Sequence, residues 1–232
     1  HAYRGAYEGG ASALDGTLGG PLVDAAAASA PAELDDLTEL REGGRPMSVI
    51  AETTHRSRWT GTADAEERAH WRGIAERVAA ELESDALQRD RANQDPTVEL
   101  DLLREAGLVT LLQPAEFGGG GAHWETAFLV IRVLSRADAS VAQVLAYHYI
   151  NSGNIGFAAD PSVQERWHRK TTEGRWVWGD SVNPTDPDLE LTVDGEGYRL
   201  NGLKRFSTGA SAGDVVLAAA LVRGGERDGQ VL

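Results

Sequence analysis

The hydrophobic residues of the chain change their spacing once, near residue 175. Before this point they recur every three or four positions, as on one face of a helix, and after it they alternate with polar residues, as in a half-buried strand. We therefore expect an α+β protein, in which an N-terminal all-α helical domain is followed by an antiparallel β domain. The expected divisions are a poorly ordered extension over 1–60, the helical domain over 61–174 and a partial β-barrel domain over 175–232.

The helical part divides into several segments. The first, 65–93, follows Asp64, which can cap a helix, and carries acidic residues early and arginines late, as the helix dipole favours. The second lies between Pro96 and Gly107, and a short apolar segment with four glycines follows it. Three further helices are expected over 123–137, 139–159 and 160–174.

Apolar residues mark the faces that these helices are expected to bury in a common core. In the first helix they are Trp71, Ile74, Val78 and Leu82. In the helix over 123–137 they are Trp124, Phe128, Ile131 and Leu134. In the helix over 139–159 they are Val141, Val144 and Leu145, and His148 lies on the same face.

Short segments with strand character follow residue 174. They are 175–182, 189–193, 198–200, 203–207 and 214–222. Asn201 and Gly202 form a dipeptide typical of a type I′ turn, which predicts a hairpin between the two segments on either side of it.

Composition excludes several classes of function. The chain has no cysteine, so it has no disulfide, no iron–sulfur cluster and no thiol nucleophile. Its net charge of −14 argues against a nucleic-acid partner, because phosphate neutralisation needs clustered Lys and Arg. No apolar run approaches the roughly 20 residues of a membrane helix, and the N-terminus lacks a secretion signal, so we expect a cytoplasmic protein with no membrane partner.

The first 46 residues are rich in Gly and Ala and contain few large apolar residues, a composition that cannot bury much surface. The only methionine, Met47, follows directly. It remains open whether residues 1–46 are native to the domain.

Two glycine-rich motifs have simple structural explanations. "GASAG" (209–213) matches a G-x-S-x-G nucleophile turn around Ser211, but no histidine follows it in the chain, so we favour a connection between strands. "FGGGG" (117–121) lacks the Lys and Ser/Thr of a phosphate loop and is expected to allow close packing before the next helix. The six histidines have no metal-ligand spacing, and His168 is expected on a charged helix face, so we expect no metal site.

His148 lies on the apolar stripe of its helix, with Asn151 three residues on. A histidine in this position is either a satisfied core residue or a general acid/base at the floor of a pocket. The same choice applies to the segment 204–208, "KRFST". It is either an edge strand or a surface in which Phe206 and Thr208, on one face, contact a flat heterocycle.

Three motifs resemble those of the acyl-CoA dehydrogenase-like flavoproteins, in the same order. "LLREAGLVTLLQPAEFGGGG" (102–121) resembles a helix followed by that superfamily's Pro-x-x-Tyr-Gly-Gly turn, with Phe117 for Tyr. "ADPSVQERWHRKTTEGRWVWGDSVNP" (159–184) resembles the helix that leads into its first flavin-side strand. "GYRLNGLKRFSTGASAGDVVLAAALV" (197–222) resembles the next flavin-side segment.

The chain resembles most the dibenzothiophene monooxygenase branch, through "AYH" (146–148), "WVWG" (176–179) and "KRFSTGA" (204–210). The resemblance implies a homotetrameric enzyme that takes reduced FMN from a separate flavin reductase. With O₂ it would oxygenate an apolar, in some cases sulfur-containing, small molecule. The alternative is an FAD-dependent acyl-CoA dehydrogenase, although Val182-Asn183 stands where the dehydrogenases carry Thr-Glu.

The resemblance also implies site residues. His148 and Thr208 would be catalytic, and Tyr147 and Asn151 would bind substrate. The cofactor-binding residues would be Asp180, Ser181, Val182, Asn183, Phe206 and Thr208. It further implies that the chain ends within the β domain and without the C-terminal helical bundle, which makes an inactive fragment a third possibility.

Overall fold

The computed structural model describes residues 61–158, 161–183, 188–194 and 197–231, so the expected extension over 1–60 lies outside the described residues. The helices are α4 (Ala65–Glu83), α5 (Ala86–Ala92), α6 (Thr97–Glu105), η1 (Ala115–Phe117), α7 (Trp124–Leu134), α8 (Ala139–Gly153), α9 (Ile155–Ala158) and α10 (Pro161–Gly174). The strands are β1 (Trp178–Ser181), β2 (Leu189–Asp194), β3 (Gly197–Gly202), β4 (Val215–Ala218) and β5 (Leu221–Arg223).

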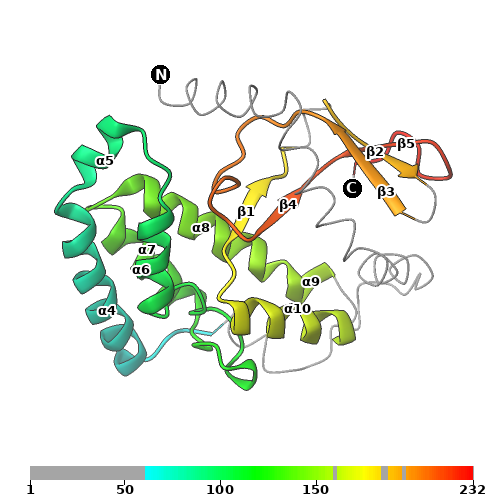
Figure 1. Ribbon diagram of the computed structural model, residues 1–232. Helices are drawn as coiled ribbons and strands as arrows, with labels where there is room; N and C mark the ends of the chain where they lie inside the picture. Colours follow the sequence, from blue (N-terminus) through cyan, green and yellow to red (C-terminus); the bar gives the residue numbers. More distant parts are fainter. Residues whose placement is uncertain (1–60, 159–160, 184–187, 195–196, 232) are drawn as a thin grey trace.

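The α+β organisation is confirmed: the helices form one block, and the strands lie against one side of it (Figure 1). Strand pairing is mixed, however, because only β2 and β3 pair antiparallel, whereas β1–β4 and β2–β5 are parallel. The expectation of a wholly antiparallel domain is therefore wrong for the described strands. A short connection joins β2 to β3, but β1 reaches β4 only after the chain has formed β2 and β3, which permits a parallel pair.

The expected helix over 65–93 is two helices. Asp64 caps α4 as predicted, since its side chain accepts from the backbone N–H of Glu67 at 2.8 Å. At the other end, Ser84 and Arg89 donate side-chain hydrogen bonds to carbonyl groups of the last turn of α4, including Leu82 O at 2.8 Å. These bonds satisfy carbonyls that continuing helix would use, and α5 starts in a new direction.

Helix α7 buries only part of the predicted face: Leu134 is buried and Trp124 and Ile131 pack against the core as expected, but Phe128 is not buried. Ala127, Val130 and Leu134 are buried, whereas Phe128 is 63% exposed. Glu67 of α4 accepts from the Thr126 hydroxyl and from the backbone N–H of His123. These bonds hold the first turn of α7 against α4, and Ala127 and Val130 join Leu134 in the core.

The four glycines before α7 allow close backbone packing, as expected. A Cβ added at Gly119 would lie 2.3 Å from the carbonyl oxygen of Gln113, and one at Gly120 would lie 2.7 Å from that of Leu111. This turn fixes the apolar segment 108–111 in the core, where Leu108, Val109 and Leu111 are fully buried.

Replacing Gly119 by alanine is expected to lower the free energy of unfolding by about 1–3 kcal/mol, because the new methyl group overlaps backbone that cannot move aside. Urea unfolding measures the change. Gly156→Ala is the control, since a Cβ there meets nothing within 4 Å. Equal stability of the two variants would contradict the tight turn.

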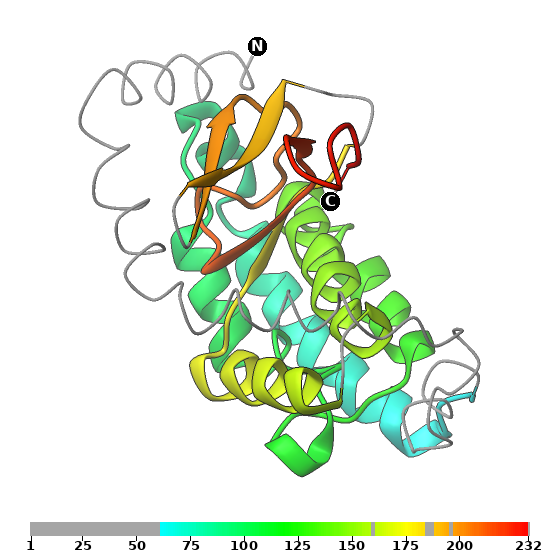
Figure 2. The ribbon, with the colours of Figure 1, turned by 90° about the vertical axis from the view of Figure 1, so that its right-hand side faces the viewer.

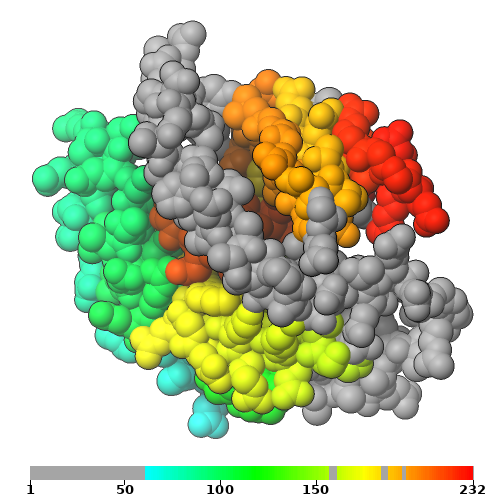
Figure 3. Space-filling view, turned by 45° about the vertical axis from the view of Figure 1, so that its right-hand side comes forward, coloured from blue at the N-terminus to red at the C-terminus, as the bar shows by residue number. Residues whose placement is uncertain are grey.

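The core lies among α4, α6, α7 and α8 and extends to Val177, next to the first strand. In the space-filling view residues of β2, β3 and β5 lie at the upper right and residues of α10 lie below them (Figure 3). Within the described ranges, no helix has the length and apolar character needed to span a bilayer.

Candidate functional site

Helix α8 runs alongside β1 (Figure 2). The side chains of His148 and Asn151 on this helix form hydrogen bonds with the strand. His148 is fully buried there. Its Nδ1 accepts from the backbone N–H of Trp178 at 3.1 Å, and its Nε2 lies 2.7 Å from the carbonyl oxygen of Val109. Because Nδ1 is an acceptor, the proton of the neutral ring is on Nε2, which donates to Val109.

Burial lowers the pKa of His148 from 6.5 to about 4, and the hydrogen bond to Val109 offsets only part of that effect. The imidazole is therefore neutral at pH 7. Since both ring nitrogens are bonded within the protein, neither is available to a substrate in this conformation.

Asn151 holds the same strand one turn further along α8. Its Nδ2 donates to the carbonyl oxygen of Gly179 at 3.0 Å and to Oδ1 of Asp180 at 3.2 Å. Asp180 is itself buried, and its backbone N–H donates to the carbonyl oxygen of Thr208 at 2.8 Å. Helix α8, strand β1 and the segment around Thr208 thus form one connected structure.

The segment 203–208 is not a strand, and Asn201-Gly202 is not a hairpin turn. Both residues belong to β3, with Gly202 opposite Leu189. After Gly202 several bonds hold the chain. They include Leu203 N–H to Asp188 O, Lys204 Nζ to Asn183 O, the Arg205–Asp188 ion pair at 2.7 Å, and a 2.8 Å bond between the hydroxyls of Ser207 and Ser181. These bonds bend the backbone into a loop over the end of β1, which we call the Phe206 loop (residues 203–213).

Phe206 has φ +62°, so the alternation of a strand does not set the directions of its neighbours. Its ring is 67% exposed. Thr208 is half-buried, and in the part of the chain that the structure describes its hydroxyl forms no hydrogen bond. An exposed ring and a vacant hydroxyl on one loop fit the face and edge of a flat, polar heterocycle such as flavin.

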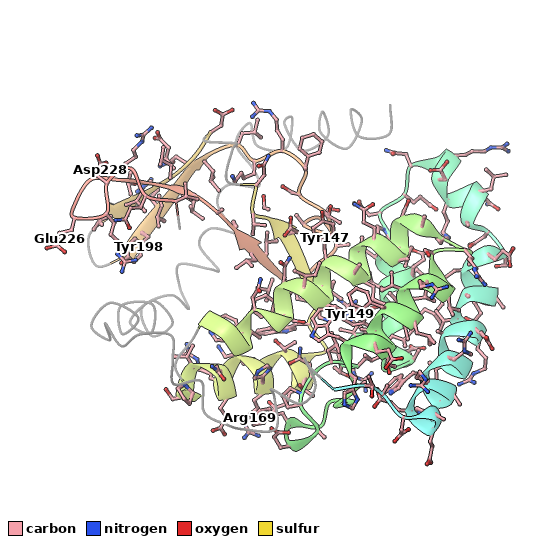
Figure 4. The ribbon with its side chains drawn as sticks, turned by 180° about the vertical axis from the view of Figure 1, so that it is seen from behind. Tyr147, Tyr149, Arg169, Tyr198, Glu226 and Asp228 are labelled. Carbon is pink, nitrogen blue, oxygen red and sulfur yellow. The ribbon has the colours of Figure 1, made fainter. Side chains whose placement is uncertain are left out.

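The other predicted site residues differ in how far they are buried. Val182 and Asn183 are half-buried, directly after β1, whereas Asp180 and Ser181 are buried and bonded within the protein. Tyr147 is half-buried and lies on the strand side of α8, while Tyr149 points into the helices (Figure 4).

Ser211 and His168, which the sequence also offered as candidates, lie outside this group of residues. Ser211 is exposed and donates to Asp95 at 2.9 Å, so "GASAG" is a loop that contacts the helical part. His168 was expected on a charged face, but it is buried, bonded to Gln113 at 2.9 Å and stacked on Phe117. No group of potential metal ligands was found among the described residues.

The sequence did not indicate Arg104 and Asp214, which join α6 to the end of the Phe206 loop at 2.8 Å. The two residues are 110 positions apart, and each is an ordinary charged residue in its local pattern.

Comparison with known proteins gives a consistent family. Residues 64–175 match the family "acyl-CoA dehydrogenase, N-terminal domain". Over 184 residues, or 76% of the chain, the sequence is 33% identical to a dibenzothiophene monooxygenase of Rhodococcus erythropolis. It is 32% identical over 148 residues, or 64% of the chain, to a probable FMNH2-dependent monooxygenase, SfnC, of Pseudomonas putida.

A solved structure with a similar fold is TdsC from Paenibacillus sp. A11-2 in complex with FMN and indole, at a TM-score of 0.66 and 30% identity. The match covers 70% of this chain and 41% of that one. The chain likewise covers 43% of the Rhodococcus enzyme and 38% of the Pseudomonas protein, so it spans about two fifths of the relatives that it matches.

Proposed function

The chain belongs to the acyl-CoA dehydrogenase-like superfamily. We propose that it is part of a flavin-dependent monooxygenase that uses reduced FMN and O₂. Its relatives named above are FMNH2-dependent or dibenzothiophene monooxygenases, and one solved relative holds FMN with indole. The substrate would be an apolar small molecule, in some cases containing sulfur.

The observation that carries the proposal is the Phe206 loop. It presents an exposed ring and an unbonded hydroxyl, Thr208, beside the half-buried residues Val182 and Asn183. A bound flavin would supply oxygen activation, which no protein side chain performs alone. The Phe206 ring would cover one face of the isoalloxazine and exclude water, and the Thr208 hydroxyl would bond to its polar edge.

The remaining site residues take different roles in this proposal. His148 and Asn151 hold β1 in place through backbone bonds at 3.1 and 3.0 Å, so we assign them to positioning rather than to proton transfer or substrate contact. Asp180 and Ser181 connect the strand to the Phe206 loop. Tyr147, on the strand side of α8, is placed to line the space for an apolar substrate.

Flavin titration tests the proposal. Reduced FMN should bind with micromolar or better affinity and FAD more weakly, as measured by anaerobic calorimetry. Addition of a flavin reductase, NADH and an apolar sulfide should then yield an ¹⁸O-labelled product under ¹⁸O₂. Preference for FAD together with reduction by an acyl-CoA would instead indicate the dehydrogenase function that the matched family's name describes.

Replacing Thr208 by valine should weaken FMN binding about tenfold, because a hydrogen bond to the flavin would be lost while the volume of the side chain is kept. The matched control is Thr192→Val in β2, whose hydroxyl has only a 3.4 Å contact with Arg199. Unchanged FMN affinity in Thr208→Val would remove this residue from the flavin site.

Two partners follow from the proposal. A separate reductase is proposed to supply the reduced flavin, as the likeness to FMNH2-dependent monooxygenases implies. The enzyme is proposed to act as a homotetramer, which light scattering at micromolar concentration would measure.

A further inference from the structure

The segment between α10 and β1 is bonded to the carboxylate of Asp214. After α10 the chain runs through Arg175 and Val177 into β1. Oδ2 of Asp214, a residue just before β4, accepts from the backbone N–H of Val177 at 2.8 Å and from Arg104 of α6 at 2.8 Å. Asp214 thereby joins α6, the entry to β1 and the end of the Phe206 loop.

Asp214 and Arg104 each form a further hydrogen bond, in both cases with the segment 175–177. The backbone N–H of Asp214 donates to the carbonyl oxygen of Val177 at 2.9 Å, so these two residues exchange hydrogen bonds. Arg104 also donates from Nε to the carbonyl oxygen of Arg175 at 3.1 Å. Arg175 has φ +51°, and the guanidinium therefore stabilises the turn that directs the chain from helix to strand.

The environment makes this pair stronger than a surface ion pair. The side chain of Arg104 is 19% exposed and that of Asp214 37%. Burial lowers the pKa of Arg104, but the hydrogen bonds that it donates to Asp214 and Asp101 outweigh this effect and raise the pKa above its ordinary value, so the guanidinium stays charged. Charge-assisted bonds to a partly buried carboxylate also fix geometry.

Close packing transmits this geometry along the loop. A Cβ at Gly213 would lie 2.8 Å from the carbonyl oxygen of Gly209 and 3.0 Å from that of Val177. A Cβ at Gly209 would lie 3.0 Å from Val144 of α8. The chain next to Thr208 thus rests directly on the backbone of β1 and on α8, and a shift at Asp214 must move it.

We propose that Arg104 and Asp214 are positioning residues that set the place of the Phe206 loop, and through it the flavin affinity, without touching the flavin. The second half of this inference rests on the proposed function. The first half concerns the loop alone and is tested separately.

The test compares Asp214→Asn with Asp101→Asn. Both changes remove one carboxylate from Arg104, but Asp101 is 69% exposed and bonds to neither Val177 nor the loop. Hydrogen exchange measured by mass spectrometry should show amides of 175–181 and 203–213 exchanging roughly 5- to 10-fold faster in Asp214→Asn. The protection of the same peptides should be unchanged in Asp101→Asn.

Affinity for reduced FMN is the second readout. We expect it to fall by about 3- to 30-fold in Asp214→Asn and to stay within about twofold of the parent in Asp101→Asn. Arg104→Gln should give a similar loss. The double variant should add little to either, because the two residues act as one unit.

The outcomes separate the two ideas. Unchanged exchange in 203–213 overturns the positioning role, whatever the flavin result. Faster exchange with unchanged FMN affinity shows that the pair orders the loop but overturns the effect on flavin. If the parent protein binds no flavin, the proposed function fails. In that case the exchange data alone decide whether Asp214 positions the loop.

Discussion

Replacing His148 by leucine should lower the free energy of unfolding by about 3–5 kcal/mol. The imidazole fills a fully buried position and bonds to Val109 O and Trp178 N–H at 2.7 and 3.1 Å. Leucine keeps most of the volume but leaves a buried carbonyl and a buried N–H without partners, and each such group costs about 1–3 kcal/mol. Chemical denaturation followed by circular dichroism measures the change.

Tyr149→Phe is the matched control for this variant. Tyr149 is the next residue of α8, is equally buried, and donates a single hydrogen bond to Leu108 O at 2.7 Å. Its loss should cost about 1–2 kcal/mol. If His148→Leu is no more destabilising than Tyr149→Phe, His148 does not hold β1, and the case for it as a proton donor becomes stronger.

Acid should destabilise the protein through the same residue. The pKa of His148 is about 4 in the folded protein and 6.5 in the unfolded chain, so between these values the unfolded state binds the proton more readily. The stability that the neutral ring contributes is complete above pH 6.5 and is lost as the pH falls toward 4. The difference corresponds to roughly 3 kcal/mol.

Other groups also take up protons at low pH, so the stability of the parent must be compared with that of His148→Leu at each pH. Burial raises the pKa of Glu67, but hydrogen bonds from Thr126 and His123 outweigh this effect and hold it below its ordinary value. Protonation of Glu67 at low pH is therefore also expected to lower the free energy of unfolding. Unfolding curves at pH 4.5 and 7.5 should therefore converge for the parent and His148→Leu as the pH falls. A constant gap between them would refute the low pKa of His148.

The periodicity of the sequence was sufficient to predict most helices and strands, because burial of one face requires it. The capping Asp64 and the stripe of Val141, Val144 and Leu145 were both predicted, and both depend on neighbours within one or two helical turns. The exposure of Phe128 could not be predicted this way, because the contact of α7 with α4 includes a hydrogen bond from Thr126 to Glu67, 59 residues earlier.

In the candidate site, too, local sequence pattern predicted the residues, but long-range contacts determine their geometry. His148 was identified from the sequence as a histidine with two readings, and its contacts with segments 30 and 39 residues away determine the geometry. The Phe206 loop was expected to be a strand, since Asn-Gly suggests a hairpin. Its bonds to Ser181, Asn183 and Asp188, which lie before β2 in the chain, decide otherwise.

The support that α8 gives to β1 has a consequence for the order of folding. The N–H groups of Trp178 and Asp180 are paired with an imidazole from α8 and a carbonyl from the Phe206 loop. Besides its ladder with β4, strand β1 therefore needs α8 and the Phe206 loop in place to complete its bonds, while the helices gain theirs locally. We expect the helical block to nucleate folding and the strands to condense on it, so that mutations in α8 slow folding and those in β4 mainly speed unfolding.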